Sequence, residues 1–260
     1  MLALRIFTLR FFLTLTLVQF GAVIYAQKSK KNMELTAGIE LRALVPISFF
    51  TMDPLNYSDS LNHFNAVATY KGGVGFGGVI RFKLTDFWNL ETGIYYTRRK
   101  YEYQVKDPVV SFDEAIPMRI VGYEIPIKGL VYIQMGKNIY MNVALGASAD
   151  FFASDTEIYK PSVSISAFKR SWFQLAVLGN VGLEYRTKKD GYFYLGATFH
   201  QPFKDILGTQ VNYYRDNVGQ AYFQNHNIDG TYFSIDFRYF IPHKDPDKGK
   251  YSNPDWQYMK

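Results

Sequence analysis

The chain has 260 residues and no cysteine, with 18% aromatic residues and a formal net charge of +6. The absence of cysteine excludes a disulfide framework and any metal site built from cysteine ligands. The 43 tyrosines and phenylalanines favour β structure, and the modest charge without a basic stripe predicts no nucleic-acid partner.

The first 26 residues have the pattern of an export signal. Arg5 and Arg10 lie in a start without acidic residues, Phe11 to Ile24 is almost wholly apolar, and Ala26 precedes a polar run. This order predicts a secretory signal peptide at 1–26, cleaved near Ala26. A membrane anchor is the alternative, but its apolar stretch is short against the roughly 20 residues that a spanning helix needs.

Alternation with a period of two is the recurring pattern in the rest of the chain. Between Met33 and Ile47, apolar residues such as Ile39 and Leu41 fall on one face, and Glu40 and Arg42 fall on the other. Because successive side chains of a strand point to opposite sides, this pattern predicts a strand with one apolar and one polar face. Eight segments share the pattern: Met33–Ile47, Gly72–Leu84, Asn89–Tyr103, Val121–Gln134, Tyr140–Phe151, Trp172–Arg186, Tyr192–His200 and Thr231–Ile241.

The glycine-rich run Gly72–Gly78 satisfies the G-x-G-x-x-G fingerprint of dinucleotide-binding proteins. Alternation continues beyond it to Leu84, where a nucleotide-binding fold needs the start of a helix. We therefore interpret the glycines as small inward-facing residues, which make room for large side chains from neighbouring strands of a narrow barrel.

The connections between the eight segments alternate in length. Three are short and four are long: 85–88, 135–138 and 187–191 against roughly 46–71, 104–120, 152–171 and 201–230. Outer-membrane barrels have an even number of strands, short periplasmic turns and long outer loops. The sequence therefore predicts an all-β fold, an eight-stranded antiparallel up-and-down transmembrane β-barrel at 33–241, after a short N-terminal segment at 27–32.

A soluble eight-stranded barrel of the lipocalin type, with the apolar face inside, is the alternative fold. The polar face carries glycine, amides and charges of both signs, which suit a crowded, hydrogen-bonded interior. The apolar face carries aromatic residues near strand ends, including Tyr96, Trp172 and Tyr185, as in the aromatic belts of membrane barrels. Both features favour a barrel in the outer membrane of a Gram-negative bacterium, with the lipid bilayer as its partner.

Charged residues on the polar faces form the candidate site. If these faces point inward, acids and bases meet in a confined lumen, where pairing is favoured because an unpaired buried charge is costly. The predicted lumen charge network consists of Glu40, Arg42, Arg81, Glu91, Arg99, Glu124, Lys128, Asp150, Glu184, Arg186, Asp236 and Arg238. Eight strands leave an interior that side chains just fill, so we predict a plugged barrel with no cofactor and no metal ion.

Four histidines raise the alternative of catalysis. His200 lies at the outer end of its segment and Asp150 at a similar height, which makes them a candidate acid–base pair. No nucleophile spacing accompanies this pair, and His63 and His226 are too isolated for a metal site. We expect no enzyme, and keep three hypotheses: a scaffold or accessory subunit of an envelope complex, a small-solute porin-like channel, and a lipid-modifying enzyme built around His200.

The segment after the last strand, 242–260, is rich in proline and charge and predicts an extended periplasmic tail. Trp256 and Tyr258 near its end are candidate contacts for a partner protein. The long loops are the other candidate contacts with envelope proteins, and the alternative for them is a folded cap over the barrel mouth.

Four short stretches carry a resemblance to a known family. These are Ala26-Gln27 at the cleavage site, the run Gly72–Gly78, Asn89–Tyr96 (NLETGIYY) and Tyr123–Ile127 (YEIPI). With them the chain resembles the small outer-membrane β-barrel proteins of Bacteroidota, the PorT-like group. The resemblance implies an eight-stranded barrel in the outer membrane, and a role in secretion or gliding machinery for some members. It supplies no catalytic residue, and the long tail departs from its pattern.

Overall fold

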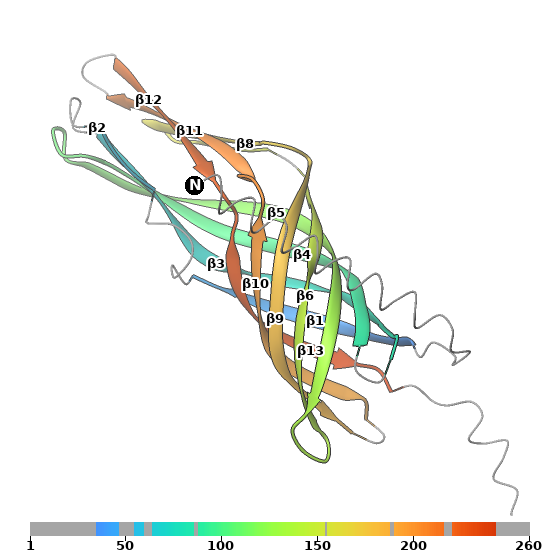
Figure 1. Ribbon diagram of the computed structural model, residues 1–260. Helices are drawn as coiled ribbons and strands as arrows, with labels where there is room; N and C mark the ends of the chain where they lie inside the picture. The colour runs from blue at the N-terminus through green and yellow to red at the C-terminus, as the bar shows by residue number, and fades with distance from the viewer. Residues whose placement is uncertain are drawn as a thin grey trace, which may run out of the picture.

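Eight antiparallel strands form a closed ring in the computed structural model (Figure 1). The structure describes residues 35–46, 55–59, 64–85, 88–153, 155–187, 190–215 and 220–242. The ring strands are β1 (Leu35–Val45), β3 (Phe64–Lys83), β4 (Trp88–Asp107), β5 (Phe112–Gln134), β6 (Ile139–Phe152), β9 (Phe173–Arg186), β10 (Tyr192–Pro202) and β13 (Tyr232–Phe240). Each pairs with the next along the chain, and β1 closes the ring by pairing with both β3 and β13. The predicted eight-stranded up-and-down barrel is confirmed.

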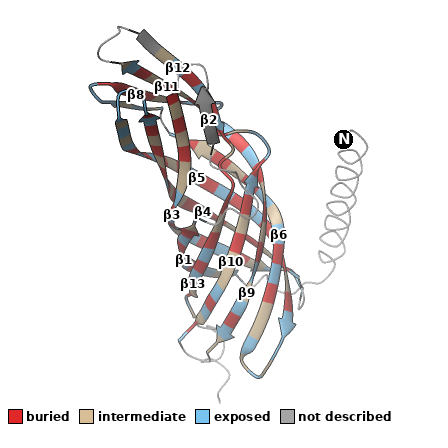
Figure 2. Ribbon diagram, turned by 90° about the vertical axis from the view of Figure 1, so that its left-hand side faces the viewer, coloured by how far each residue is buried: buried red, intermediate tan, exposed pale blue. Residues whose placement is uncertain are grey.

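The two faces of the ring strands differ sharply in exposure, as the alternating colours of Figure 2 show. On β1, Ile39 and Leu41 are 57% and 55% exposed, whereas Glu40 and Arg42 between them are 1% and 5% exposed. The other ring strands repeat this arrangement, with mostly apolar side chains outside and polar or charged side chains in the lumen. This is the arrangement of a barrel whose outer surface contacts lipid, and it is the reverse of a soluble lipocalin-type barrel. In the described part of the chain, moreover, no helix has the length and apolar character needed to cross a membrane.

Aromatic side chains on the outer surface gather near both ends of the barrel. We call the end with the four long connections the loop end, and the end with the three short ones the turn end. Phe151, Trp172 and Phe173 contact one another near the loop end, with ring centroids 5.4–6.2 Å apart. Phe193 and Tyr239 form a pair near the turn end, 5.2 Å apart. These positions are typical of the aromatic girdles at the two membrane–water interfaces.

The glycine-rich run lies in β3, where Gly73, Gly75 and Gly77 lie on the inward face and Gly78 lies on the outward face. A methyl group added at Gly77 would overlap the ring of Tyr95 on β4, and one added at Gly75 would lie 3.4 Å from the Cβ atom of Arg42. Gly182 and Gly196 leave room for Tyr194 in the same way. The absent side chains therefore create the space that large lumen side chains fill.

We expect Gly77→Ala to lower the free energy of unfolding by about 1–3 kcal/mol, because the added methyl group forces the packed Tyr95 ring and the backbone apart. Gly78→Ala is the matched control, since nothing lies within 4 Å of a methyl group there and the residue faces outward. Urea titration of both variants in lipid vesicles, followed by tryptophan fluorescence, measures the difference. Equal midpoints for Gly77→Ala and Gly78→Ala would contradict this packing.

The long connections fold into further strands at the loop end, which the sequence prediction treated as loops. β2 (Leu55–Asp59) pairs with the outer part of β3. A second sheet has the order β12-β11-β8-β7. Its strands are β7 (Thr156–Tyr159), β8 (Val163–Lys169), β11 (Leu207–Arg215) and β12 (Gln220–Ile228). The ring strands β3, β4 and β5 also run further than predicted, so the two sheets face each other beyond the barrel (Figure 1).

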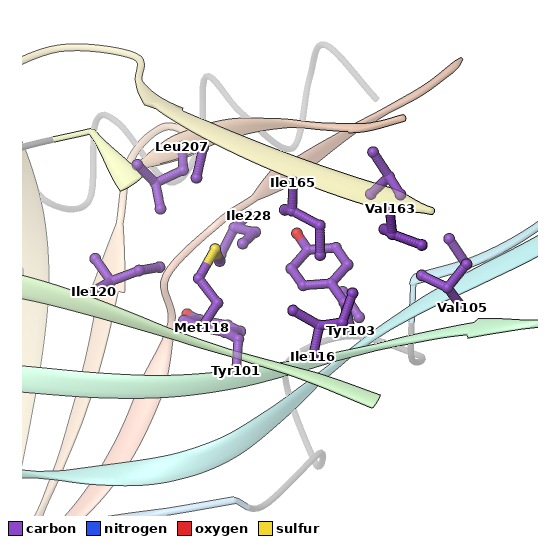
Figure 3. Packing of buried hydrophobic residues seen from close by; sticks show 14 of the residues in the cluster. Tyr101, Tyr103, Val105, Ile116, Met118, Ile120, Val163, Ile165, Leu207 and Ile228 are labelled. Carbon is purple, nitrogen blue, oxygen red and sulfur yellow. The ribbon is translucent and has the colours of Figure 1, made fainter. Parts of the chain in front are cut away.

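A hydrophobic core fills the space between these two sheets, and we call the whole region the outer extension (Figure 3). The cluster includes Tyr103 and Ile116 on the long hairpin, and Ile165 and Leu207 on the second sheet. The hydroxyl group of Tyr103 donates a hydrogen bond to Thr209 Oγ1 at 2.8 Å, and burial raises its pKa to about 12. The loop end of the barrel is therefore closed by a dry core, as expected for a folded cap.

Candidate functional site

The twelve charged residues of the predicted lumen network all lie on inward-facing positions of the ring. Six are acidic and six are basic, and eleven of them are buried, whereas the Arg186 side chain is 32% exposed. Taking these charges out of water is costly unless each is paired and hydrogen-bonded. The pairing of each residue therefore decides what the lumen can do.

Glu91 is the centre of the network in the middle of the barrel. Its carboxylate is fully buried and lies 2.5 Å from Lys128 Nζ, 2.9 Å from Arg81 Nη2 and 3.1 Å from Arg238 Nη1. Arg238 also lies 2.9 Å from Glu40. Strands β1, β3, β4, β5 and β13 are thus joined across the lumen by ion pairs.

Toward the loop end, Arg42 and Glu124 continue the network. Arg42 Nε donates a hydrogen bond to Glu40 at 2.7 Å, and its Nη1 donates to Glu124 at 2.8 Å. Glu124 also accepts hydrogen bonds from Arg99 Nη2 at 3.2 Å and from the Tyr232 hydroxyl group at 2.8 Å. The Arg42 guanidinium group lies 3.8 Å from the centre of the Tyr95 ring, so this part of the lumen is filled by stacked and paired groups.

Toward the turn end, Glu184 ends the network. Its carboxylate accepts hydrogen bonds from Arg81 Nη1 at 2.6 Å and from Arg186 Nε at 2.7 Å. The Arg81 guanidinium group lies over the Phe240 ring, 4.0 Å from its centre, and Arg186 lies over Tyr140 at 4.1 Å. Aromatic faces thus shield both cations at this end.

Asp236 differs from the four glutamates of the network because neutral groups supply most of its contacts. It accepts a hydrogen bond from Ser234 Oγ at 2.6 Å and from Asn180 Nδ2 at 3.2 Å, and a close one from Thr198 Oγ1. Arg238 Nη2 is more distant, at 3.7 Å. Tyr194 donates to Asn180 Oδ1 at 2.7 Å and extends this polar layer.

His200 and Asp150, the candidate acid–base pair, lie together near the loop end. His200 Nε2 is 3.0 Å from Asp150 Oδ2, and both side chains are about 1% exposed. The imidazole ring stacks on Tyr232, with ring centres 4.7 Å apart. His200 Nδ1 has no hydrogen-bond partner among the described residues. The pair is therefore sealed inside the barrel rather than open to a substrate at the rim.

Glu124 joins this pair in a group that offers three metal-ligand atoms within 4.8 Å of one another. A carboxylate–histidine set of this kind suits a divalent ion. The charges around it do not, because Arg42 and Arg99 already bind the Glu124 carboxylate. We therefore keep the sequence expectation of a lumen without a metal ion.

The lumen also contains residues that the sequence analysis did not select. Tyr95, Tyr194 and Tyr232 fill the space between the ion pairs, and Asn180 anchors the layer around Asp236. These residues occupy the same phase of the period-two pattern as the charged residues, and that phase could have identified them as lumen residues. The candidate partner contacts Trp256 and Tyr258 lie outside the described residues, as do His63, the export signal and the tail from residue 243.

A closed ring with apolar side chains toward lipid and a charged, filled lumen defines the class of outer-membrane β-barrel proteins. Residues 25–208 match the model of the family described as Outer membrane protein beta-barrel domain, and the chain belongs to this family. The chain is therefore a protein of the outer membrane and contacts its lipid bilayer.

Solved structures of three outer-membrane proteins are similar to the chain. The outer membrane protein OprG from Pseudomonas aeruginosa shares 14% identity, with 80% of this chain and 96% of that chain covered and a TM-score of 0.48. The outer membrane protease OmpT from Escherichia coli shares 9% identity over 80% and 95% of the two chains, with a TM-score of 0.31. The beta domain of the Bordetella autotransporter BrkA shares 12% identity over 82% and 100%, with a TM-score of 0.30. No curated protein matches the chain.

Proposed function

We propose that this protein is an occluded, non-enzymatic outer-membrane barrel that serves as a scaffold or accessory subunit of an envelope complex. The observation that carries the proposal is the ion-pair network across the lumen, in which five acids pair with six bases and the sixth acid, Asp150, pairs with His200. A barrel filled in this way anchors a structure in the membrane and does not provide a path for solutes.

The outer extension supports a role in presenting a surface. Its two sheets share a hydrophobic core, and an ion pair of 2.7 Å joins Arg215 of the second sheet to Asp107 of β4. A region held by its own core keeps a fixed shape for a partner at the cell surface. The resemblance to the PorT-like proteins of Bacteroidota favours secretion, motility or assembly machinery as the complex concerned.

The two ends of the chain complete the proposal. We infer export through the signal at 1–26 with cleavage near Ala26, and a periplasmic position for the tail at 242–260. Trp256 and Tyr258 are the tail residues proposed to contact the partner.

We expect affinity purification in a mild detergent to recover one envelope protein in a fixed ratio to the barrel. Deletion of residues 243–260 removes that partner if the tail binds it. The double variant Trp256→Ala/Tyr258→Ala, which keeps the tail and removes its two aromatic side chains, is expected to lose the partner as well. Recovery of the barrel alone from cross-linked cells, under conditions that preserve known envelope complexes, would contradict the scaffold role.

A lipid-modifying enzyme is the second candidate, because His200 and Asp150 lie 3.0 Å apart. The burial of both side chains argues against access for a lipid headgroup. We expect cells that carry His200→Ala to have unchanged outer-membrane lipids in mass spectrometry. A lipid species that disappears in His200→Ala cells and returns with the wild-type gene would establish the enzyme instead.

A further inference from the structure

The apolar outer surface ends abruptly on β3, β4 and β5. On β4, the outward-facing residues from Trp88 to Tyr96 are mostly apolar, and the next two are Arg98 and Lys100. On β5, the outward-facing residues change from apolar to basic between Val121 and Arg119. The register pairs Arg98 with Val121 and Lys100 with Arg119, so the change on β5 lies one outward-facing residue beyond the change on β4.

A basic patch lies along this edge, formed by Lys71, Arg98, Lys100 and Arg119. Lys71 comes from β3, where a bulge between Tyr70 and Gly73 interrupts the register with β4. Lys100 and Arg119 are directly opposite each other on paired strands and both are exposed. Two like charges directly across a strand pair destabilise a sheet unless an anion lies between them.

The patch has few internal counter-charges. Lys71 pairs with Glu102 at 2.9 Å, whereas Arg98, Lys100 and Arg119 have no ion-pair partner among the residues that the structure describes. Arg98 Nε is buried and lacks a hydrogen-bond partner. The patch therefore presents an excess of positive charge, and Arg98 Nε is a hydrogen-bond donor without an acceptor in the described part of the chain.

The position of the patch identifies the membrane layer that it faces. Trp88 to Arg98 covers ~33 Å of strand, and at a tilt of ~40° this length rises ~25 Å, which is the height of the apolar band of outer-membrane barrels. Directly below the patch lie the rings of Phe76, Tyr96 and Tyr123, with neighbouring centres 5.1 and 5.9 Å apart. Because the long connections mark the outer side, the patch lies at the headgroups of the outer leaflet.

We propose that the basic patch binds the phosphate groups of a phosphorylated glycolipid in the outer leaflet. Arg98, Lys100 and Arg119 converge on the phosphate, since guanidinium and ammonium groups form charge-assisted hydrogen bonds with phosphate oxygens. Tyr96 and Tyr123 pack against the sugar and the upper acyl chains. The site does not depend on the scaffold role, because it uses only the lipid-facing surface of the barrel.

The test compares binding of bis-phosphorylated lipid A and its dephosphorylated form to the purified, delipidated barrel by native mass spectrometry. The triple variant Arg98→Gln/Lys100→Gln/Arg119→Gln is expected to bind the phosphorylated lipid at least ~10-fold more weakly, from the attraction of each basic residue to an anionic lipid surface. The variant Lys106→Gln/Lys137→Gln/Lys160→Gln loses the same charge elsewhere and is expected to bind like the wild type. Inorganic phosphate is added as a competitor.

Each outcome supports or overturns the site. Equal binding of both lipids by the wild type, equal loss in both triple variants, or full displacement by millimolar inorganic phosphate would overturn it. Heat-modifiable migration in gels shows whether each variant is folded. Arg98→Lys/Arg119→Lys keeps the charge and is expected to keep most of the binding, so loss of binding in this variant also overturns the proposal.

Discussion

Replacement of Arg238 by methionine is expected to lower the free energy of unfolding by about 3–5 kcal/mol, because it leaves buried carboxylates without their cation. Arg238 is fully buried and lies within 4 Å of Glu40, Glu91 and Asp236. Methionine has a similar length and fills much of the same space, so a cavity contributes little to the loss. Urea unfolding in lipid vesicles, followed by tryptophan fluorescence, measures the effect.

Lys137→Met is the matched control for this prediction. Lys137 is exposed in the short turn between β5 and β6, and a substitution there is expected to change the free energy of unfolding by less than about 0.5 kcal/mol. A loss below about 1 kcal/mol for Arg238→Met would show that water reaches the lumen carboxylates and that the network is not sealed.

The ring strands were predictable because lipid and lumen impose opposite demands on alternate residues. A charge on the outer face of β1 would lie in hydrocarbon, so Glu40 and Arg42 mark the inward phase without knowledge of the structure. The glycines of the run on β3 share this inward phase, which predicted that they make room for large side chains in the lumen. Gly77 does make room for Tyr95.

The ends of β4 and β5 were not predictable by the same rule, because the polarity of the two faces inverts at the membrane edge. Beyond Tyr101 the outward residues, such as Glu102 and Gln104, face water, whereas Tyr103 and Val105 face the dry core of the outer extension. A prediction that requires polar residues on the inward face therefore ends the strand near Tyr103, although β4 continues to Asp107. In the second sheet, β8 alternates over only seven residues, too few for a firm prediction.

The members of the lumen network followed from the sequence, but their partners did not. Arg42 binds Glu124, and Arg81 binds Glu184, across 82 and 103 positions of the chain. Such pairs depend on the stagger of the closed ring, which no single strand encodes. His200 and Asp150 were expected at a similar height and lie together, whereas the stacking of His200 on Tyr232 requires the register between β10 and β13.

The central claim is that the barrel conducts no solute, because ion pairs and aromatic rings fill its lumen. Single-channel recording of the purified protein in planar lipid bilayers is the direct measurement, with an open porin inserted under the same conditions as the positive control. Counting of fluorescently labelled barrels in the bilayer shows that insertion has taken place.

We expect no steady current above the bilayer background at either polarity, since Glu91, Lys128 and Arg238 meet in the middle of the lumen. The hydrophobic core of the outer extension adds a second closure at the loop end. A steady large-channel current that scales with the number of inserted barrels would contradict the occluded lumen, and with it the proposed scaffold function.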